Sequence, residues 1–239
     1  MGQPALNLRV KIFADGAEKD GMLSMNRNPI IAGFTTNPTL MRKAGLSDYE
    51  GFAKEILCHI KDKPISFEVF SDDFDEMEQQ AHKIASWGQN VYVKIPITNT
   101  RGEASTKLVE KLSLGGVKLN VTAIMTVAQV KLMLPALSRG PGSYVSVFAG
   151  RIADAGVDPL PIMSEVVSLL KGHPNIELIW ASPRELYNLV QADAIGCHII
   201  TATNDIIKKI PTLGKDLAEF SLDTVKMFFN DAQAAGFTI

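Results

Sequence analysis

Short apolar runs alternate with longer amphipathic segments along nearly the whole chain, which is the pattern of repeated strand–helix units around a parallel sheet. Eight runs have the length and the β-branched or aromatic content of buried strands, at residues 10–14, 31–35, 65–70, 91–95, 119–124, 144–148, 177–180 and 198–202. Because closure removes the exposed edges of an open sheet, eight such units favour a closed (β/α)8 TIM barrel.

Helical periodicity fills the intervals between the predicted strands. It is clearest over residues 74–87, 103–114 and 159–170, and a glycine follows each segment within two residues. An additional C-terminal helix is predicted over 222–235, with Val225, Phe228 and Phe229 along it. These side chains are expected to cover the chain's own barrel or a neighbouring subunit, and the pattern does not choose between the two.

The composition is that of one large core. The chain has 239 residues, 46% of them hydrophobic, and no linker or low-complexity segment, so we expect a single domain over residues 1–239. Lys and Arg number 24 against 26 Asp and Glu. This balance argues against nucleic acid or an anionic membrane as a partner, and a phosphate ligand would need a local basic cluster.

Cysteine and histidine give no sign of a metal or a disulfide. The two cysteines, Cys58 and Cys197, form no CxxC pair, and both are expected to fill the core of a protein in a reduced compartment. The four histidines lie outside metal-binding spacings. Residues 1–9 lack the pattern of a secretory signal and no apolar run is long enough to span a membrane, so a cytoplasmic protein is expected.

The run at residues 91–97 has one ammonium group inside an apolar strand. A lysine desolvated among apolar neighbours is pushed towards the neutral amine, which can form a Schiff base with a carbonyl compound. Pro96 cannot donate to a ladder and is expected to end the strand, which places Lys94 near the carboxyl end, where active sites of parallel α/β proteins gather. The alternative is an edge strand from which Lys94 extends its charge into water.

Other polar residues come at the ends of the remaining predicted strands. They are Asp15, Thr36, Asn37, Glu68, Asn120, Thr122, Ser146, Arg151, Ser182 and Arg184. Singly, each also fits an ordinary role as a turn residue, a helix cap, a partner of nearby backbone or a surface charge. Arg184 would stand in the first turn of a helix, where a cation opposes the macrodipole unless an anion binds between them. Together they favour a site for a phosphorylated carbonyl compound.

Seven stretches in one order resemble a known family. They are residues 13–15, the TTNP at 35–38, 67–69, 93–96, 119–122, 146–152 and 181–184. Along nearly the whole chain the sequence is similar to the transaldolases and the related fructose-6-phosphate aldolases, which are Schiff-base aldolases on a (β/α)8 barrel.

The resemblance implies a role for each of these residues. Lys94 would attack the C2 ketone of fructose 6-phosphate or sedoheptulose 7-phosphate, and an aldose phosphate would accept the dihydroxyacetone unit, as in the pentose phosphate pathway. Asp15 would handle the C4 hydroxyl proton, while Glu68 and Thr122 position a water. The implied substrate contacts are Asn37, Asn120 and Ser146 for the dihydroxyacetone unit, and Arg151, Ser182 and Arg184 for the phosphate. No cofactor or metal is expected, because the iminium is the electron sink.

Two positions separate a transferase from a free aldolase within this resemblance. The fructose-6-phosphate aldolases have a glutamine in place of Glu68 and a tyrosine that aids enamine protonation in place of Phe148. A phenyl ring cannot relay a proton, so transaldolase is favoured over release of free dihydroxyacetone. A barrel that binds sugar phosphates without catalysis is the further alternative.

The chain also resembles the compact members of the family, many of which form rings through an exchanged C-terminal helix. A homo-oligomer, a pentamer or decamer, is therefore expected. Pro183 and Val147 depart from the family pattern, and they leave the acceptor open, including a sugar with a sulfonate terminus.

Overall fold

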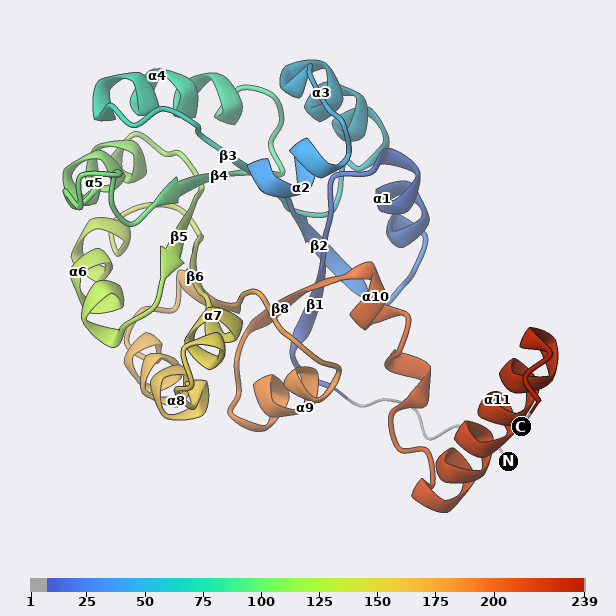
Figure 1. The fold of residues 1–239 in the computed structure, drawn as a ribbon. Coiled ribbons are helices and arrows are strands. Elements are labelled where there is room, and N and C mark those ends of the chain that lie inside the picture. Colours follow the sequence, from blue (N-terminus) through green and yellow to red (C-terminus); the bar gives the residue numbers. More distant parts are fainter. Residues whose placement is uncertain (1–7, 239) are drawn as a thin grey trace. The chain divides into compact units, whose positions relative to one another are not determined.

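The computed structural model describes residues 8–238. Eight parallel strands close into a barrel in sequence order, as Figure 1 shows. The strands are β1 (Lys11–Asp15), β2 (Ile31–Thr35), β3 (Ile65–Glu68), β4 (Val91–Pro96), β5 (Leu119–Ile124), β6 (Ser143–Val147), β7 (Ile176–Trp180) and β8 (Ile199–Thr203). The predicted barrel is confirmed. The prediction about a secretory signal falls mostly on residues 1–7, which lie outside the described residues.

Helices surround the barrel, and the short helices α2 and α7 lie inside the ring of longer ones (Figure 1). They are α1 (Lys19–Asn26), α2 (Pro38–Lys43), α3 (Tyr49–His59), α4 (Phe74–Ala85), α5 (Thr106–Leu114), α6 (Val127–Leu137), α7 (Ala149–Asp154), α8 (Pro159–Leu170), α9 (Tyr187–Ala194) and α10 (Asn204–Ile207). None of the helices in residues 8–238 combines the length and apolar character needed to cross a bilayer.

Local chemistry sets where these helices begin. The side chain of Asp73 accepts hydrogen bonds from the first turn of α4, and Thr126 forms a reciprocal capping box with Gln129 at the start of α6. Helix α5 begins three residues later than predicted. Thr98 pairs with Ala104 in an antiparallel bridge, which holds the preceding residues in a loop.

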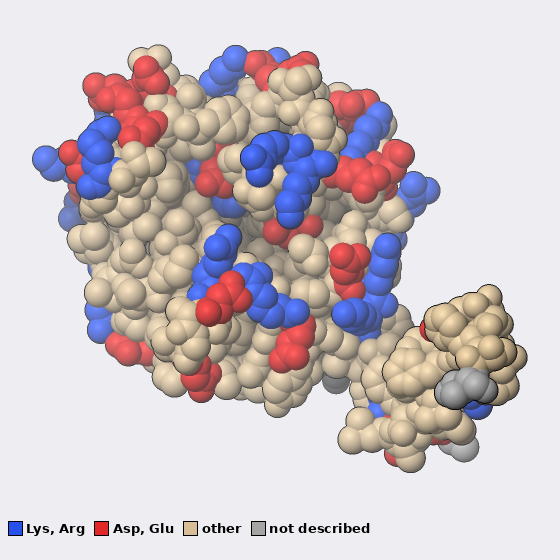
Figure 2. All heavy atoms as spheres, in the orientation of Figure 1, with Lys and Arg blue, Asp and Glu red and all other residues tan. Residues whose placement is uncertain are grey.

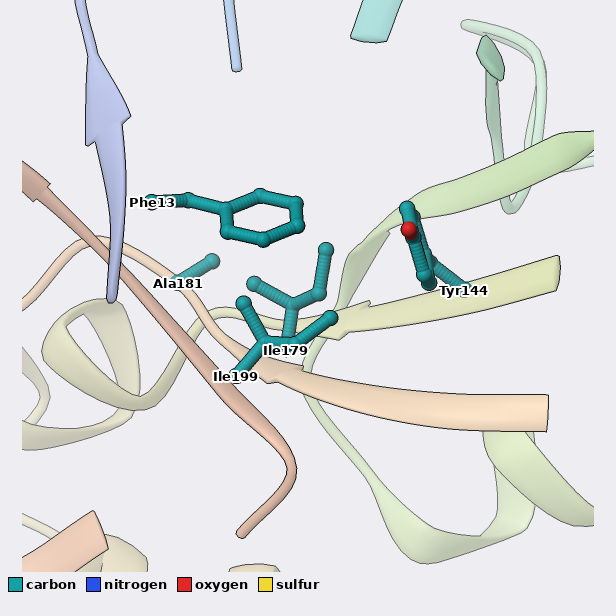
Figure 3. Close-up of a cluster of buried hydrophobic side chains, with 5 residues drawn as sticks. All are labelled: Phe13, Tyr144, Ile179, Ala181 and Ile199. Carbon is teal, nitrogen blue, oxygen red and sulfur yellow. The ribbon is translucent and has the colours of Figure 1, made fainter. Parts of the chain in front are cut away.

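An apolar layer lies inside the barrel beneath its carboxyl-terminal end. Phe13, Tyr144, Ile179, Ala181 and Ile199 pack together there, as Figure 3 shows. A glycine on β2 makes room for the Phe13 ring, because a Cβ added to it would lie 2.6 Å from that ring. Side chains alternate along a strand, so Asp15 follows Phe13 on the same face and the polar residues stand beyond this layer.

Residues 208–238 belong to a second compact unit. It contains a short 3-10 helix, η1 (Ile210–Thr212), and α11 (Leu217–Ala235), which begins earlier than the predicted 222–235. Helix α11 has no buried residue, and Val225, Phe228 and Phe229 are 59%, 63% and 63% exposed. The single domain over 1–239 stays a prediction.

The two cysteines have different environments. Cys197 is buried, and burial raises the pKa of its thiol to about 12. Cys58 is exposed on α3, so its predicted place in the core is wrong. It follows the apolar residues Ile56 and Leu57, but it lies on the solvent face of the helix.

Candidate active site

Lys94 lies on β4, in register with Glu68 of β3 and Asn120 of β5. It is only 6% exposed. Its Nζ is 3.1 Å from Oε2 of Glu68 and donates a hydrogen bond to the Thr36 carbonyl at 2.9 Å. The predicted burial is confirmed, and the alternative of an edge strand is wrong because the barrel is closed. The expected apolar surroundings of the amine are also wrong, since two oxygen atoms face it.

The pair of Lys94 and Glu68 explains how both charges are accommodated inside the barrel. A buried charge without a partner is costly, whereas two opposite charges at hydrogen-bonding distance largely compensate their lost hydration. The Glu68 carboxylate lies 3.1 Å from the Lys94 amine, so it is within reach of a proton that this amine gives up when it acts as a nucleophile.

Asp15 is the last residue of β1 and is held by a chain of two hydroxyl groups. Oγ1 of Thr35 donates to Oδ1 of Asp15 at 2.8 Å, and it also lies 2.5 Å from Oγ1 of Thr201 on β8. Burial raises the pKa of Asp15, and the positive charge of Lys94 partly opposes this. Asp15 therefore keeps its proton to higher pH than a solvated carboxyl group, which suits a group that gives and takes protons.

Asn120 joins three strands through its side chain. Its Nδ2 donates to Oγ of Ser66 at 3.0 Å, and its Oδ1 accepts from Oγ of Ser146 at 2.7 Å. The alternative in which Asn120 bonds only to nearby backbone is therefore wrong. Thr122 is 2% exposed, and its hydroxyl has no hydrogen-bond partner among the described residues. Ala123, which follows it, has a left-handed φ of 60°.

Asn37 caps α2. Its Oδ1 accepts from the Leu40 N–H at 2.9 Å, so the helix-cap interpretation is confirmed, and its role in holding substrate stays a prediction. Thr36 is fully buried and donates from Oγ1 to the Ser66 carbonyl at 2.8 Å. Phe148 is the N-cap residue of α7 and packs against the apolar layer.

The predicted phosphate residues lie on two segments that touch. Ser182 has a left-handed φ of 59°, and a Cβ added to Gly150 would lie 1.6 Å from the Ser182 carbonyl oxygen. Only glycine permits this approach. The contact places Arg151, the next residue of α7, close to the segment of Ser182 and Arg184. Figure 2 shows basic side chains gathered beside α7 and over α2 on this face.

Arg184 has an acidic partner that sequence reasoning missed. Its Nε donates to Oδ1 of Asp154 at 2.8 Å, and its Nη1 donates to Oγ of Ser182 at 2.9 Å. The Arg184 hydrogen bond lowers the pKa of Asp154. The two residues are 30 positions apart, so no local spacing in the sequence signalled this pair. The macrodipole argument for Arg184 is wrong, because α9 begins at Tyr187.

Comparison with known proteins places this arrangement in a family. The model of the transaldolase/fructose-6-phosphate aldolase family matches residues 12–239. The chain belongs to this family. A probable transaldolase from a Thermoanaerobacter species (strain X514) is 36% identical over 84% of this chain and 89% of its own. Probable transaldolase 2 of Listeria monocytogenes is 34% identical over 90% of this chain and 95% of its own. An aldolase-type enzyme is thereby supported.

Solved structures of other proteins have a fold similar to that of this chain. A mandelate oxidase mutant has a TM-score of 0.57 at 15% identity, over 85% of this chain and 68% of that one. A 2,3-dimethylmalate lyase has a TM-score of 0.52 at 11% identity, over 97% and 85%. These likenesses concern the fold alone. Within residues 8–238, no group of three or more His, Cys, Asp or Glu side chains could hold a metal ion.

Proposed function

We propose that this protein is a cytoplasmic transaldolase of the pentose phosphate pathway. It transfers a dihydroxyacetone unit from fructose 6-phosphate or sedoheptulose 7-phosphate to an aldose phosphate through a Schiff base on Lys94. The observation that carries the proposal is the buried Lys94 amine, held between a carboxylate and a carbonyl inside the barrel of a transaldolase-family chain.

In this mechanism the amine first loses a proton to Glu68, directly or through a water. The free amine adds to the C2 ketone, and the carbinolamine then loses water to give the iminium. Glu68 and Thr122 position that water, and the buried hydroxyl of Thr122 supports this role. Asp15 takes the proton of the C4 hydroxyl as the C3–C4 bond breaks, and the bonding electrons pass into the iminium. An aldehyde leaves, and an enamine remains on Lys94.

The second half of the reaction runs in reverse with another aldehyde. The enamine attacks the acceptor's carbonyl carbon, Asp15 returns a proton to the new alkoxide, and water releases the product from Lys94. Asn120, Ser146 and Asn37 hold the dihydroxyacetone unit. The hydrogen bonds from Asn120 to Ser66 and Ser146 support this role, because they fix the amide before substrate arrives.

Arg151, Ser182 and Arg184 bind the phosphate group of both donor and acceptor. Charge-assisted hydrogen bonds from two guanidinium groups suit a dianion. Asp154 orients Arg184 and compensates part of its charge, which is expected to weaken phosphate binding enough for one sugar phosphate to leave and the next to enter.

Transfer is distinguished from free aldol cleavage by supplying fructose 6-phosphate without an acceptor. A transaldolase releases little dihydroxyacetone, because Phe148 has no hydroxyl to protonate the enamine. Phe148→Tyr is the matched variant, and its release of dihydroxyacetone is expected to be faster. Sustained release by the unaltered protein would instead make it a fructose-6-phosphate aldolase.

The C-terminal helix supports a homo-oligomer as the working form. Its apolar side chains at Val225, Phe228 and Phe229 are exposed, and a second copy of the chain would bury them. Sedimentation should give a pentamer or decamer for the full chain and smaller species for Phe228→Asp. A monomer in both would contradict the proposed homo-oligomer.

A further inference from the structure

The hydrogen-bond ladder between β2 and β3 stops just before Glu68, which is the residue of β3 in register with Lys94 of β4. The strands are in register at Thr35 and Ser66, and the last regular bond joins the Thr36 N–H to the Ser66 carbonyl at 3.1 Å. In a parallel ladder the Thr36 carbonyl would next accept from the Glu68 N–H. Both groups have other partners instead, although nothing in the sequence of either strand forbids the bond.

The hydroxyl of Tyr49 forms hydrogen bonds with both the backbone N–H and the backbone carbonyl of Glu68. The Glu68 N–H donates to Oη at 2.8 Å, and Oη donates to the Glu68 carbonyl at 3.0 Å. Tyr49 is the first residue of α3, and its ring is packed edge-on against Phe67, Phe70 and Trp87 at centroid distances of 6.1, 4.5 and 5.7 Å. Burial raises the pKa of Tyr49, so the phenol stays neutral and can donate and accept at once.

With the Glu68 N–H bonded to Tyr49, the Thr36 carbonyl has no ladder partner on β3 and accepts from Nζ of Lys94 at 2.9 Å. The amine is thereby held between this carbonyl and the Glu68 carboxylate. We propose that Tyr49 is a positioning residue of the Lys94 site, whose hydroxyl replaces one bond of the β2–β3 ladder and leaves the Thr36 carbonyl to orient the amine. This inference rests on the proposed function of Lys94.

Tyr49 acts through the backbone of Glu68 and touches no reacting atom. If its hydroxyl is removed, the Glu68 N–H is left buried without a partner, and the Thr36 carbonyl is the acceptor that a regular ladder offers. Closure of that bond would draw the Glu68 backbone towards β2, so the Thr36 carbonyl would be shared between two donors and the Glu68 carboxylate would move relative to the Lys94 amine. The cost should fall on the rate of Schiff-base formation, because the contacts to the sugar phosphate are elsewhere.

The test compares Tyr49→Phe with Tyr144→Phe. The control also loses a buried hydroxyl, in the apolar layer beneath the site, where the Tyr144 ring stacks on Tyr92 at 4.1 Å. Thermal unfolding is measured for both variants, and kcat and KM for fructose 6-phosphate with erythrose 4-phosphate as acceptor. The rate at which borohydride traps the donor on Lys94 is followed in parallel.

Tyr49→Phe is expected to lower kcat and the trapping rate together by about tenfold to a hundredfold, with KM changed by less than about threefold. Tyr144→Phe should keep kcat within about twofold. A crystal structure of Tyr49→Phe should show the Glu68 N–H bonded to the Thr36 carbonyl. Unchanged trapping in Tyr49→Phe, or equal losses in both variants, would overturn the inference alone. Absence of a Lys94 adduct in the unaltered protein would overturn the proposed function as well.

Discussion

Gly150→Ala should destabilise the protein even though alanine is the better helix former. Gly150 is the second residue of α7, where alanine would contribute about 1 kcal/mol through helix propensity. The added Cβ would lie 1.6 Å from the Ser182 carbonyl oxygen and 2.7 Å from its carbonyl carbon. These are backbone atoms that cannot rotate away. Overpacking usually costs about 1–3 kcal/mol, and rigid atoms place this case at or above the upper end.

The net loss is therefore about 2 kcal/mol or more, which corresponds to a fall in Tm of about 4–8 °C for a chain of this size. Separation of α7 from the segment of Ser182 and Arg184 would also move Ser182 away from Arg151, so KM for phosphorylated donors should rise. Gly172→Ala is the matched control, because its Cβ would meet nothing closer than 3.9 Å. Differential scanning calorimetry and donor kinetics measure both effects. Equal Tm and KM for Gly150→Ala and the unaltered protein would refute the proposed dependence of the phosphate site on the contact between Gly150 and Ser182.

Two further changes test other parts of the site. Arg184→Ala should raise the free energy of the transition state for phosphorylated donors by about 1.5–3 kcal/mol, with little effect on unphosphorylated sugars. Arg139→Ala, at an exposed position after α6, serves as its control, and equal losses on both kinds of sugar would contradict the phosphate role. Asp15→Asn tests the buried carboxyl group. Because the folded-state pKa of Asp15 is raised, its ionisation destabilises the folded protein as pH rises above the ordinary value of 3.8. Asp15→Asn should therefore have a higher Tm than the unaltered protein at pH 8 and an equal Tm at pH 4. The same difference in Tm at both pH values would contradict the raised pKa of Asp15.

The strands and the order of polar residues at their ends could be predicted because both depend on local periodicity. The residue types of β4 alone indicated a buried strand with Lys94 near its end. The partners of these residues could not be predicted in the same way. The Lys94 bond to Thr36 spans 58 positions, the Arg184 bond to Asp154 spans 30 and the Tyr49 bond to Glu68 spans 19.

The wrong predictions for Lys94 and Arg184 both rest on residues that are neighbours in the sequence. Lys94 was expected among apolar groups because its neighbours in sequence are apolar, but alternate residues of a strand face opposite sides. The side chains that surround its amine come from other strands. Arg184 follows the seventh predicted strand closely, which predicts a place in the first turn of a helix, whereas the structure begins α9 at Tyr187.

Borohydride reduction in the presence of fructose 6-phosphate, followed by peptide mass mapping, tests the proposed chemistry most directly. The account predicts a dihydroxyacetone adduct on Lys94 in the unaltered protein and in the control Lys171→Ala, and none in Lys94→Ala, which should retain its fold and lose turnover. An adduct on any other lysine, or no adduct in the unaltered protein, would contradict it.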